Sequence, residues 1–563
     1  MFKSIHPFKA LSVMALSAVL LLVACGAPSA GQTSQATDTP QASGGTQPPA
    51  ATMAAMATTA ATTAAPAATA AAATEAPATQ AAATGDVPEL IYYLAATGAP
   101  NALKDLADVQ DAINKILVPK IGAKIKLQPI SFTEAAQKTM LTLQSGEPCD
   151  LLSVSSFVPY IPAVNSGGLV PLDDLLPKYA PNLWQRLKPE WWDAARVNGK
   201  IYTAPIYNGW TSYAGFWARA DLIDKYKFDW KNTKKWEDWE PLFDQILKNE
   251  KDVTPILSSD YWGQFWYPTY YGYDPIDESI GSGRGGSLIG VKIGDTTRKV
   301  QLVLDTPEYR QSIDLAHKWY TKGYLLKDII PDNDMGAKRS QLKFGVFMFP
   351  GTGDFSTQAM ADTEWNHVPI YTQHLQPKTL LTTAIGRTGY SVCTTSKHPD
   401  LAVKYIEEAN QNADLLNLLN FGIEGKHWVW KDKANKVIGL PPGQTMDTAS
   451  WLPNAYWEFG DRRNLYLTDP TDIGVWDRID KGINAADISP VMGFTFNPKP
   501  VENEIAQVNT VAKEFEALNR GMVDNIDSKL ADYKAKLKQS GIDKIIAEAQ
   551  QQIDAWSKTN AKK

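Results

Sequence analysis

The chain of 563 residues has little histidine and cysteine, with six of the former and three of the latter. Cys149 and Cys393 have no histidine at the spacing of a zinc site, so the sequence predicts no metal site. A Gly-x-Ser-x-Gly motif, the signature of α/β-type serine hydrolases, is absent from the sequence. We therefore expect a function that uses no cofactor and no serine nucleophile.

Clustered positive charge and a second long apolar run are also missing. The sequence contains 55 Lys and Arg residues and 61 Asp and Glu residues, which gives a net charge of −6. No basic run of the kind that contacts phosphates appears, so nucleic acid is not an expected partner. The one long apolar run, residues 10–24, is shorter than the roughly 20 residues that a membrane-spanning helix needs.

Residues 1–24 have the pattern of a secretory signal peptide. Lys3 and Lys9 make its start positive, and the apolar run ends in Leu-Val-Ala-Cys-Gly at residues 22–26. This ending resembles the lipobox of bacterial lipoproteins, in which the cysteine becomes the acylated first residue of the mature protein. We therefore expect a lipid on Cys25 that anchors the protein to the outer face of the cell membrane. An ordinary signal peptide with an incidental cysteine is the alternative.

The segment after Cys25 is too polar and too simple to fold. Residues 26–85 are almost entirely Ala, Thr, Pro, Gln, Ser and Gly, without one aromatic or basic side chain. Such a chain cannot bury enough apolar surface to offset the entropy of ordering. We expect residues 25–86 to be a disordered linker with an end-to-end distance of roughly 40–50 Å.

From residue 88 onward, strand and helix patterns alternate. The expected strands cover residues 89–94, 123–130 and 149–154, and the expected helices cover residues 101–117 and 133–144. This order predicts an open α/β domain. Ligands bind beyond the carboxyl ends of the strands in such sheets, so Ser155 and Ser156 are candidate ligand-binding residues. Loop capping is the alternative role for these hydroxyls.

Two later motifs resemble a known family. Gly-Leu-Val-Pro-Leu-Asp at residues 168–173 and Asn-Gly-Lys-Ile-Tyr-x-x-Pro at residues 198–205 are similar to segments of the extracellular solute-binding proteins of ABC sugar importers. Residues 213–222 resemble that family's crossing strand. The resemblance implies a hinged, two-lobed periplasmic-binding-protein-like fold of type II. Tyr207, Asn208 and Trp210 would then lie at the hinge and contact the sugar, with core packing as the alternative for Trp210.

Aromatic residues are concentrated in one part of the chain. Ten of the 18 tryptophans lie between residues 184 and 266, and the densest stretch contains Trp262 and Trp266. We expect these two rings to line the sugar site, although a large second-lobe core would give the same pattern. Asp354 lies in a turn that family members place at the cleft mouth. Arg387 precedes the expected return strand and could bind the ligand or pair with a carboxylate.

The C-terminal third extends the resemblance. Phe-Gly-Ile-Glu-Gly-Lys-His-Trp at residues 421–428 closely resembles a signature of the LplA-like subfamily of these lipoproteins. Residues 493–504 and 541–556 resemble the extra C-terminal domain of that subfamily, and the second range has the pattern of an amphipathic helix. We expect Glu424 and Trp428 to contact the ligand. A structural hydrogen bond is the alternative for Glu424, and a lone Glu-x-x-His is a weak metal motif.

These patterns predict two lobes. The first lobe would contain residues 88–206 and 388–425, and the second would contain residues 207–387 and 426–563, including the additional C-terminal helices. Cys149 and Cys393 could form a disulfide in an exported protein or remain buried thiols.

The predicted function is capture of a carbohydrate, most simply an oligosaccharide, and its delivery to the permease subunits of an ABC importer. The protein would act as a lipid-anchored monomer and would not be an enzyme. A secreted carbohydrate-active hydrolase is the alternative, and it would need two carboxyl groups about 5–9.5 Å apart. A peptide-binding lipoprotein on a similar scaffold is a third possibility.

Overall fold

The computed structural model describes residues 87–96, 101–155, 157–257, 271–281, 287–328, 338–351, 355–357, 361, 365–386 and 388–560. All of these belong to one compact unit, which spans Ala83–Lys563. The expected signal peptide and linker lie outside the described residues, as do Cys25, Ser156, Trp262, Trp266, Asp354 and Arg387. None of the described helices combines the length and apolarity that spanning a membrane requires.

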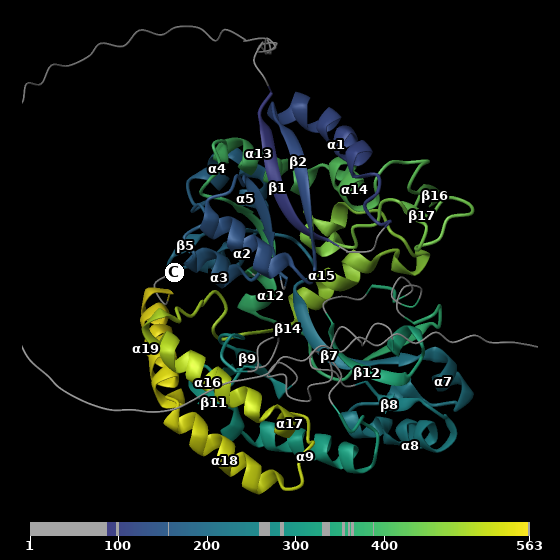
Figure 1. Ribbon diagram of the computed structural model, residues 1–563, viewed down its shortest axis with the longest axis vertical. Helices are drawn as coiled ribbons and strands as arrows, with labels where there is room; N and C mark the ends of the chain where they lie inside the picture. The colour runs from purple at the N-terminus through teal and green to yellow at the C-terminus, as the bar shows by residue number, and fades with distance from the viewer. Residues whose placement is uncertain are drawn as a thin grey trace, which may run out of the picture. The chain divides into compact units, whose positions relative to one another are not determined.

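The first lobe is built on a five-stranded sheet of order β2-β1-β3-β15-β6 (Figure 1). Helices α1 (Leu106–Ile121) and α2 (Ala135–Ser145) return the chain between strands, so the first three strands are parallel. The parallel strands are β1 (Glu89–Ala96), β2 (Lys124–Ser131) and β3 (Leu151–Val154). The sheet is completed by β15 (Gly389–Val392) and β6 (Ala204–Pro205), with β15 antiparallel to both β3 and β6. The predicted α/β start is therefore confirmed.

Helix α1 shows how the sequence produces this packing. Its buried residues are Val109, Ile113, Leu117 and Ile121, which recur every four residues and form one apolar face. That face joins the same hydrophobic core as the buried side of β1. The helix ends at Ile121 because Gly122 adopts a φ of 73°, a left-handed conformation that glycine reaches without a steric penalty.

The second lobe contains a mixed sheet of order β18-β14-β7-β12-β8, with β13 also paired to β7. Its strands are β7 (Thr211–Arg219), β8 (Thr254–Ile256), β12 (Phe344–Gly351), β13 (Ile370–His374), β14 (Thr379–Leu380) and β18 (Asp487–Ile488). Strand β7 corresponds to the expected crossing strand. Phe216 on β7 packs against Trp239, Phe243 and Trp319, all of which are fully buried. A large part of the aromatic content therefore fills the core of this lobe.

The C-terminal part of the chain forms a layer of helices. Figure 1 shows α16 (Glu502–Glu514), α18 (Ile526–Gln539) and α19 (Ile542–Asn560) side by side, and each contacts the other two. They share a core with β9 (Tyr273–Pro275), β10 (Ile289–Lys292), β11 (Val300–Leu302) and α9 (Pro307–Thr321). The predicted amphipathic helix is confirmed as α19, because Ile542, Ile545, Ala549 and Ile553 are buried.

One predicted boundary differs from the way in which the chain packs. Residues 426–563 were expected to lie wholly in the second lobe, yet Trp451, Phe459 and Ile479 pack in the same core as Leu90 and Tyr92 of β1. Helix α15 (Val475–Ala485) contributes to that core as well. The chain rejoins the second lobe only at β18. The spacing of apolar residues shows that one face of a segment is buried, but it does not show which lobe buries that face. The return of residues 451–485 to the first-lobe core could therefore not be predicted from the sequence.

Cys149 and Cys393 form a disulfide, with their Cα atoms 5.6 Å apart. Cys149 precedes β3 and Cys393 follows β15, so the bond links the two strands next to their paired ends, Leu151 and Val392. This resolves the alternative left open by the sequence. The bond closes a loop of 244 residues between the first-lobe strand and the returning strand.

Reduction of this disulfide should destabilise the first lobe. A loop of this length corresponds to up to about 5 kcal/mol of unfolding free energy in the chain-entropy model. We expect a lower urea midpoint for a chain starting at residue 83 when reductant is present. The Cys149→Ala/Cys393→Ala variant should show the same lower midpoint with or without reductant. Identical midpoints for the oxidised protein and the double variant would contradict this assignment.

Candidate functional site

The carboxyl ends of β1 and β3 lie next to each other in the sheet, and a distant segment covers them. We call residues 455–463 the edge segment. The backbone N–H of Ala95 donates to Oε2 of Glu458 at 3.2 Å, and the Ser153 hydroxyl donates to the Glu458 carbonyl at 3.4 Å. These contacts bring residues more than 300 positions apart to the sheet edge at which α/β proteins bind ligands.

A buried tyrosine cluster holds the edge segment in place. Tyr92, Tyr390 and Tyr405 are fully buried, with ring centroids 5.7–5.9 Å apart. The Tyr92 and Ser153 hydroxyls are 2.6 Å apart, and the N–H of Gly460 donates to the Tyr390 hydroxyl at 3.1 Å. Burial raises the pKa of all three phenols well above the ordinary value, so they remain neutral hydrogen-bonding groups.

Four aromatic rings gather at this edge, and we call them the aromatic platform: Phe132, Phe157, Tyr456 and Trp457. Phe132 stacks on Trp457 with centroids 5.7 Å apart, and Phe157 lies 4.5 Å from Phe132. Tyr456 meets Trp457 edge to face at 4.9 Å. Tyr456 is 41% exposed and the other three rings are partly exposed. Exposed ring faces of this kind are typical of sites that bind partly apolar ligands such as sugars.

A buried arginine continues the platform. The Arg462 guanidinium lies 4.6 Å from the Tyr456 ring centroid and 4.2 Å from that of Phe355, which meets Trp476 edge to face. Its Nη1 donates to Oδ1 of Asn208 at 2.5 Å. Burial lowers the pKa of Arg462 to about 10, so the group keeps its charge at neutral pH. The site thus combines flat apolar rings with a fixed hydrogen-bond donor.

Glu458 is the most perturbed carboxyl group at this edge. It is completely buried, and burial raises its pKa to about 8, although the Ser155 hydroxyl and the Ala95 N–H act in the opposite direction. At neutral pH the group is therefore mostly uncharged. Its Oε1 has no hydrogen-bond partner in the described part of the chain.

The structure brings two of the predicted ligand residues to this site. Ser155 follows β3, is almost fully buried, and its Oγ accepts a hydrogen bond from the N–H of Phe157 at 3.1 Å. Asn208 is joined to the platform through Arg462. Both placements agree with a role at the ligand site, and for Ser155 the capping alternative also holds.

Tyr207 and Trp210 lie beneath the surface. The Tyr207 hydroxyl donates to Asp480, and the Arg463 guanidinium lies 4.0 Å from the centre of its ring. Trp210 is 2% exposed, its indole N–H donates to the Ile206 carbonyl, and Trp191 covers it edge to face. The packing alternative accounts for Trp210 fully, because neither ring face is open to a ligand here.

Glu424 and Trp428 belong to a different contact. Glu424 is exposed, and the buried Trp428 donates its indole N–H to the Gly422 carbonyl. Among the described residues, no hydrogen bond or ring contact links either of them to the aromatic platform. Their predicted ligand role therefore gains no support from these contacts.

The signature around His427 fastens this region to the start of α1. His427 Nδ1 accepts from the N–H of Ile423, and its Nε2 lies 3.0 Å from Oδ2 of Asp105. The Ser450 hydroxyl donates to the same Asp105 oxygen at 2.6 Å. The three side chains do not form a catalytic triad, because the serine and the histidine both bind the aspartate rather than each other.

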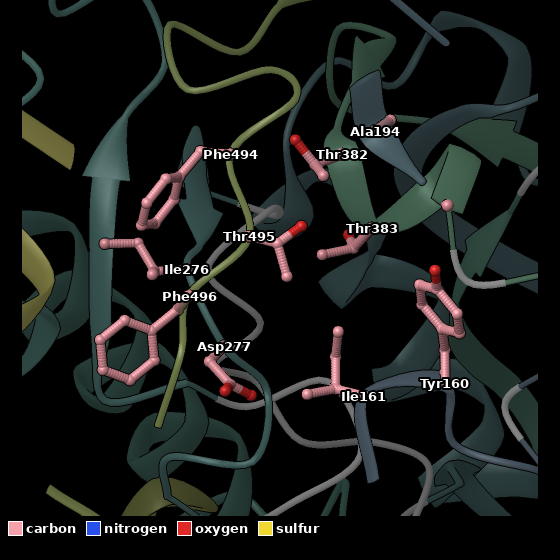
Figure 2. Close-up of a pocket in the computed structure, with 11 residues that line it drawn as sticks. Tyr160, Ile161, Ala194, Ile276, Asp277, Thr382, Thr383, Phe494, Thr495 and Phe496 are labelled. Atoms are coloured by element: carbon pink, nitrogen blue, oxygen red, sulfur yellow. The ribbon is translucent and has the colours of Figure 1, made fainter. Parts of the chain in front are cut away.

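Two hollows in the structure do not fit a sugar site. Figure 2 shows Tyr160 and Ile161 facing Phe496 and Ile276 across a cavity of about 30 Å³. This volume suits water and falls far below the roughly 300–1,000 Å³ of small-ligand pockets. A hollow of about 580 Å³ is large enough for a small ligand, but it is lined by residues 514–536 of the C-terminal helices rather than by the carboxyl edge of the first-lobe sheet.

Sequence reasoning did not single out the platform residues, Glu458 or Arg462. The only sequence signal for them was the run Tyr-Trp-Glu-Phe-Gly-Asp-Arg-Arg at residues 456–463, which mixes rings and charges without a helix or strand period. The structure gives it only the short helical turns η5 (Tyr456–Glu458) and η6 (Arg462–Asn464).

Comparison with known proteins identifies the family. Residues 104–414, more than half of the chain, match the model of bacterial extracellular solute-binding proteins. The chain belongs to this family. Residues 490–558, which contain the C-terminal helices, match a model described only as a domain of unknown function, DUF3502.

Individual relatives agree with this membership. A carbohydrate ABC transporter substrate-binding protein from Streptococcus pneumoniae serotype 4 (strain TIGR4) is 26% identical over 477 residues, covering 84% of this chain and 92% of the relative. The crystal structure of the N-glycan transport solute-binding protein of S. pneumoniae matches with a TM-score of 0.73 at 23% identity, covering 84% and 100% of the two chains. Its complex with Man1GlcNAc matches with a TM-score of 0.68.

A more distant structure shares the same architecture. An extracellular solute-binding protein from Bifidobacterium longum subsp. infantis matches with a TM-score of 0.57 at 16% identity, covering 83% of this chain and 98% of the other. The type II solute-binding fold expected from the sequence is thus confirmed.

The buried carboxyl group should make stability depend on pH. Because folded Glu458 keeps its proton to higher pH than the unfolded chain does, its contribution to stability is lost as pH rises from about 4.5 to about 8, by up to about 1.4 kcal/mol per unit. We expect this loss to be absent from Glu458→Gln. Urea unfolding at a series of pH values measures it, with the exposed Glu424→Gln as the matched control. Parallel curves for wild type and Glu458→Gln would contradict the assignment.

Proposed function

We propose that this solute-binding protein captures a carbohydrate on the aromatic platform and delivers it to the membrane subunits of an ABC importer. The observation that carries the proposal is the gathering of four partly exposed rings at the carboxyl edge of the parallel sheet. Sugars present flat apolar faces and a rim of hydroxyl groups. The rings suit the faces, while Arg462 and Asn208 supply polar groups for the rim.

The relatives support a carbohydrate ligand. The pneumococcal relative is a carbohydrate transporter component, and solved structures of the same fold hold Man1GlcNAc, Man5GlcNAc and kestose. All three ligands contain more than one sugar unit. A platform of several rings in a row is consistent with an oligosaccharide for this chain as well.

Binding in this scheme uses hinge closure rather than chemistry. The chain passes from β6 to β7 through residues 206–210, returns to the first lobe at β15, and enters the second lobe again at β18, so three crossings connect the lobes in the described part of the chain. Closure about such crossings would bring second-lobe residues onto a sugar held by the platform. Micromolar affinity needs about −8 kcal/mol, which a few stacked rings and hydrogen bonds can supply.

The proposal does not include hydrolysis. A carboxyl group with a raised pKa, such as that of Glu458, is also what a general acid requires. Glu458, however, is completely buried behind the platform, and the neighbouring Asp461 is paired with Arg463 at 2.6 Å and with Arg186 at 3.6 Å. Glycoside hydrolysis needs two carboxyl groups that both face the scissile bond.

Sugar binding can be tested directly. We expect Man1GlcNAc or a longer oligosaccharide to raise the melting temperature of the wild-type protein, because a ligand of the native state stabilises it. Trp457→Ala should weaken binding about tenfold, since a stacked ring contributes about 1 kcal/mol or more. Calorimetric titration measures the affinity. Trp230→Ala is the matched control, because Trp230 is a partly buried second-lobe ring that stacks on Tyr371.

Three results would contradict the proposal. Cleavage of the sugar, detected in the recovered ligand, would favour a hydrolase. Binding of peptides in place of sugars would favour a peptide-binding lipoprotein. An equal loss of affinity in the Trp457 and Trp230 variants would remove the platform as the binding surface.

The location of the protein follows from the same proposal. A lipid on Cys25 would hold it on the outer face of the cell membrane, where residues 26–85 would separate the folded unit from the surface. We expect Cys25→Ser to move the protein from the membrane fraction to the medium or to leave it unprocessed. Immunoblotting of cell fractions after labelling with a fatty-acid probe measures both outcomes. Probe incorporation into the serine variant would contradict Cys25 as the acylated residue.

A further inference from the structure

Glu458 links the edge segment to the ends of strands β1 and β3, which lie more than 300 residues earlier in the sequence. Its carboxyl oxygen Oε2 accepts from the Ala95 N–H near the end of β1, and its main-chain carbonyl accepts from the Ser153 hydroxyl of β3. The adjoining residues Tyr456 and Trp457 carry two of the four platform rings. The other two, Phe132 and Phe157, follow β2 and β3. The Glu458 side chain is therefore one of the contacts, beside those of Ser153 and Tyr390, that set the spacing between the two halves of the platform.

We propose that Glu458 is a positioning residue of the ligand site: its carboxyl group joins the edge segment to the end of β1, beside the contact of its main-chain carbonyl with β3, and thereby helps to set the spacing of the rings that the sugar contacts. This inference rests on the proposed carbohydrate function. It goes beyond that function by assigning a role to a residue that the ligand does not touch, because Glu458 is completely buried.

The surroundings of Glu458 allow only an uncharged carboxyl group in this role. Strands β1 and β15 and helix α13 (Pro399–Gln411) present Tyr92, Tyr390 and Tyr405, which burial keeps neutral. Strand β3 presents the uncharged Ser153 and Ser155. Among the described residues, no positive group offsets a negative charge on Glu458, since burial is the main influence on its pKa and the others are hydrogen bonds.

The charged residues of the edge segment are engaged elsewhere. Asp461 pairs with Arg463 and Arg186. Arg462 donates to Asn208 and lies against the rings of Tyr456 and Phe355. An ionised Glu458 would thus be an unpaired buried charge, which must either regain its proton or draw water into the edge. Water there would separate the edge segment from the strands.

Sugar affinity should therefore fall at high pH. In the wild-type protein we expect the affinity for Man1GlcNAc to drop about fivefold or more between pH 6.5 and pH 9, as Glu458 loses its proton. Glu458→Gln keeps the size and neutrality of the acid, so its affinity should change less than about twofold over that range. Glu458→Ala should bind about tenfold more weakly than wild type at both pH values. Glu190→Gln, at an exposed position outside the edge segment, should follow the wild-type profile.

A second measurement works without any sugar. Because the Ala95 amide donates to Glu458, its hydrogen exchange should be faster in Glu458→Ala than in wild type and should remain slow in Glu458→Gln. Wild-type exchange at Ala95, corrected for the intrinsic pH dependence, should also speed up above about pH 8.

The two measurements separate the two proposals. If wild type binds no sugar, but Ala95 exchange responds as expected, then the carbohydrate function fails and the link made by Glu458 stands. If sugar binds but wild type and Glu458→Gln share one pH profile, the positioning role is overturned. The same conclusion follows if Glu458→Ala binds as tightly as wild type with unchanged Ala95 exchange.

Discussion

The structure of the site depends on the contact between the end of β1 and the edge segment. Ala95 and Glu458 are 363 residues apart in sequence, yet their hydrogen bond fixes where four aromatic rings meet. The buried tyrosines stabilise this contact from below, because Tyr390 accepts the Gly460 N–H and Tyr92 bonds to Ser153. Buried polar networks of this type are costly unless each group finds a partner, so they specify one arrangement. Oε1 of Glu458, the Tyr405 hydroxyl and Nε of Arg462 are buried atoms of this region that have no hydrogen-bond partner in the described part of the chain.

A buried carboxyl oxygen without a hydrogen-bond partner makes the binding edge sensitive to the charge of Glu458. A carboxyl group without a compensating cation is stable only when neutral, so its environment is sensitive to water entry. Arg462 is a buried group that keeps its charge at neutral pH, because burial lowers its pKa only to about 10 while the nearby Tyr456 and Asp472 act in the opposite direction. The two residues lie four positions apart on one short segment. The neutral carboxyl group of Glu458 faces the sheet, whereas the charged guanidinium of Arg462 lies against the aromatic rings.

The sequence predicted the parts of this protein that follow a local period. Strand β1, helix α1 and helix α19 repeat their apolar residues at the spacing of their own geometry, so their existence and order could be derived. The assignment of Trp451 and Phe459 to the first lobe could not, because it depends on which surface the returning chain meets. The same limit applies to Trp210, because the sequence around a tryptophan near a hinge does not distinguish a ring that faces a sugar from one that packs in the core.

The candidate site was predictable only in its location. The carboxyl edge of the sheet followed from the strand order, and Ser155 was placed there correctly. The rings were not foreseen, because Tyr456 and Trp457 lie in a single helical turn and reach the edge through tertiary contacts alone. A segment that carries both aromatic and charged residues without a period is the feature to look for in related chains.

The first lobe is assembled from three separated stretches of chain, and this has a consequence for secretion. Its sheet needs β15, its disulfide needs Cys393, and its ligand edge needs the segment that ends at residue 463. A chain that emerges from its N-terminus must therefore expose more than four-fifths of its length before the binding edge can form. Until then the apolar faces of β1 and α1 have no complete core to enter. A chain that is released from its N-terminus onward can therefore form the binding edge only after residue 463 has emerged.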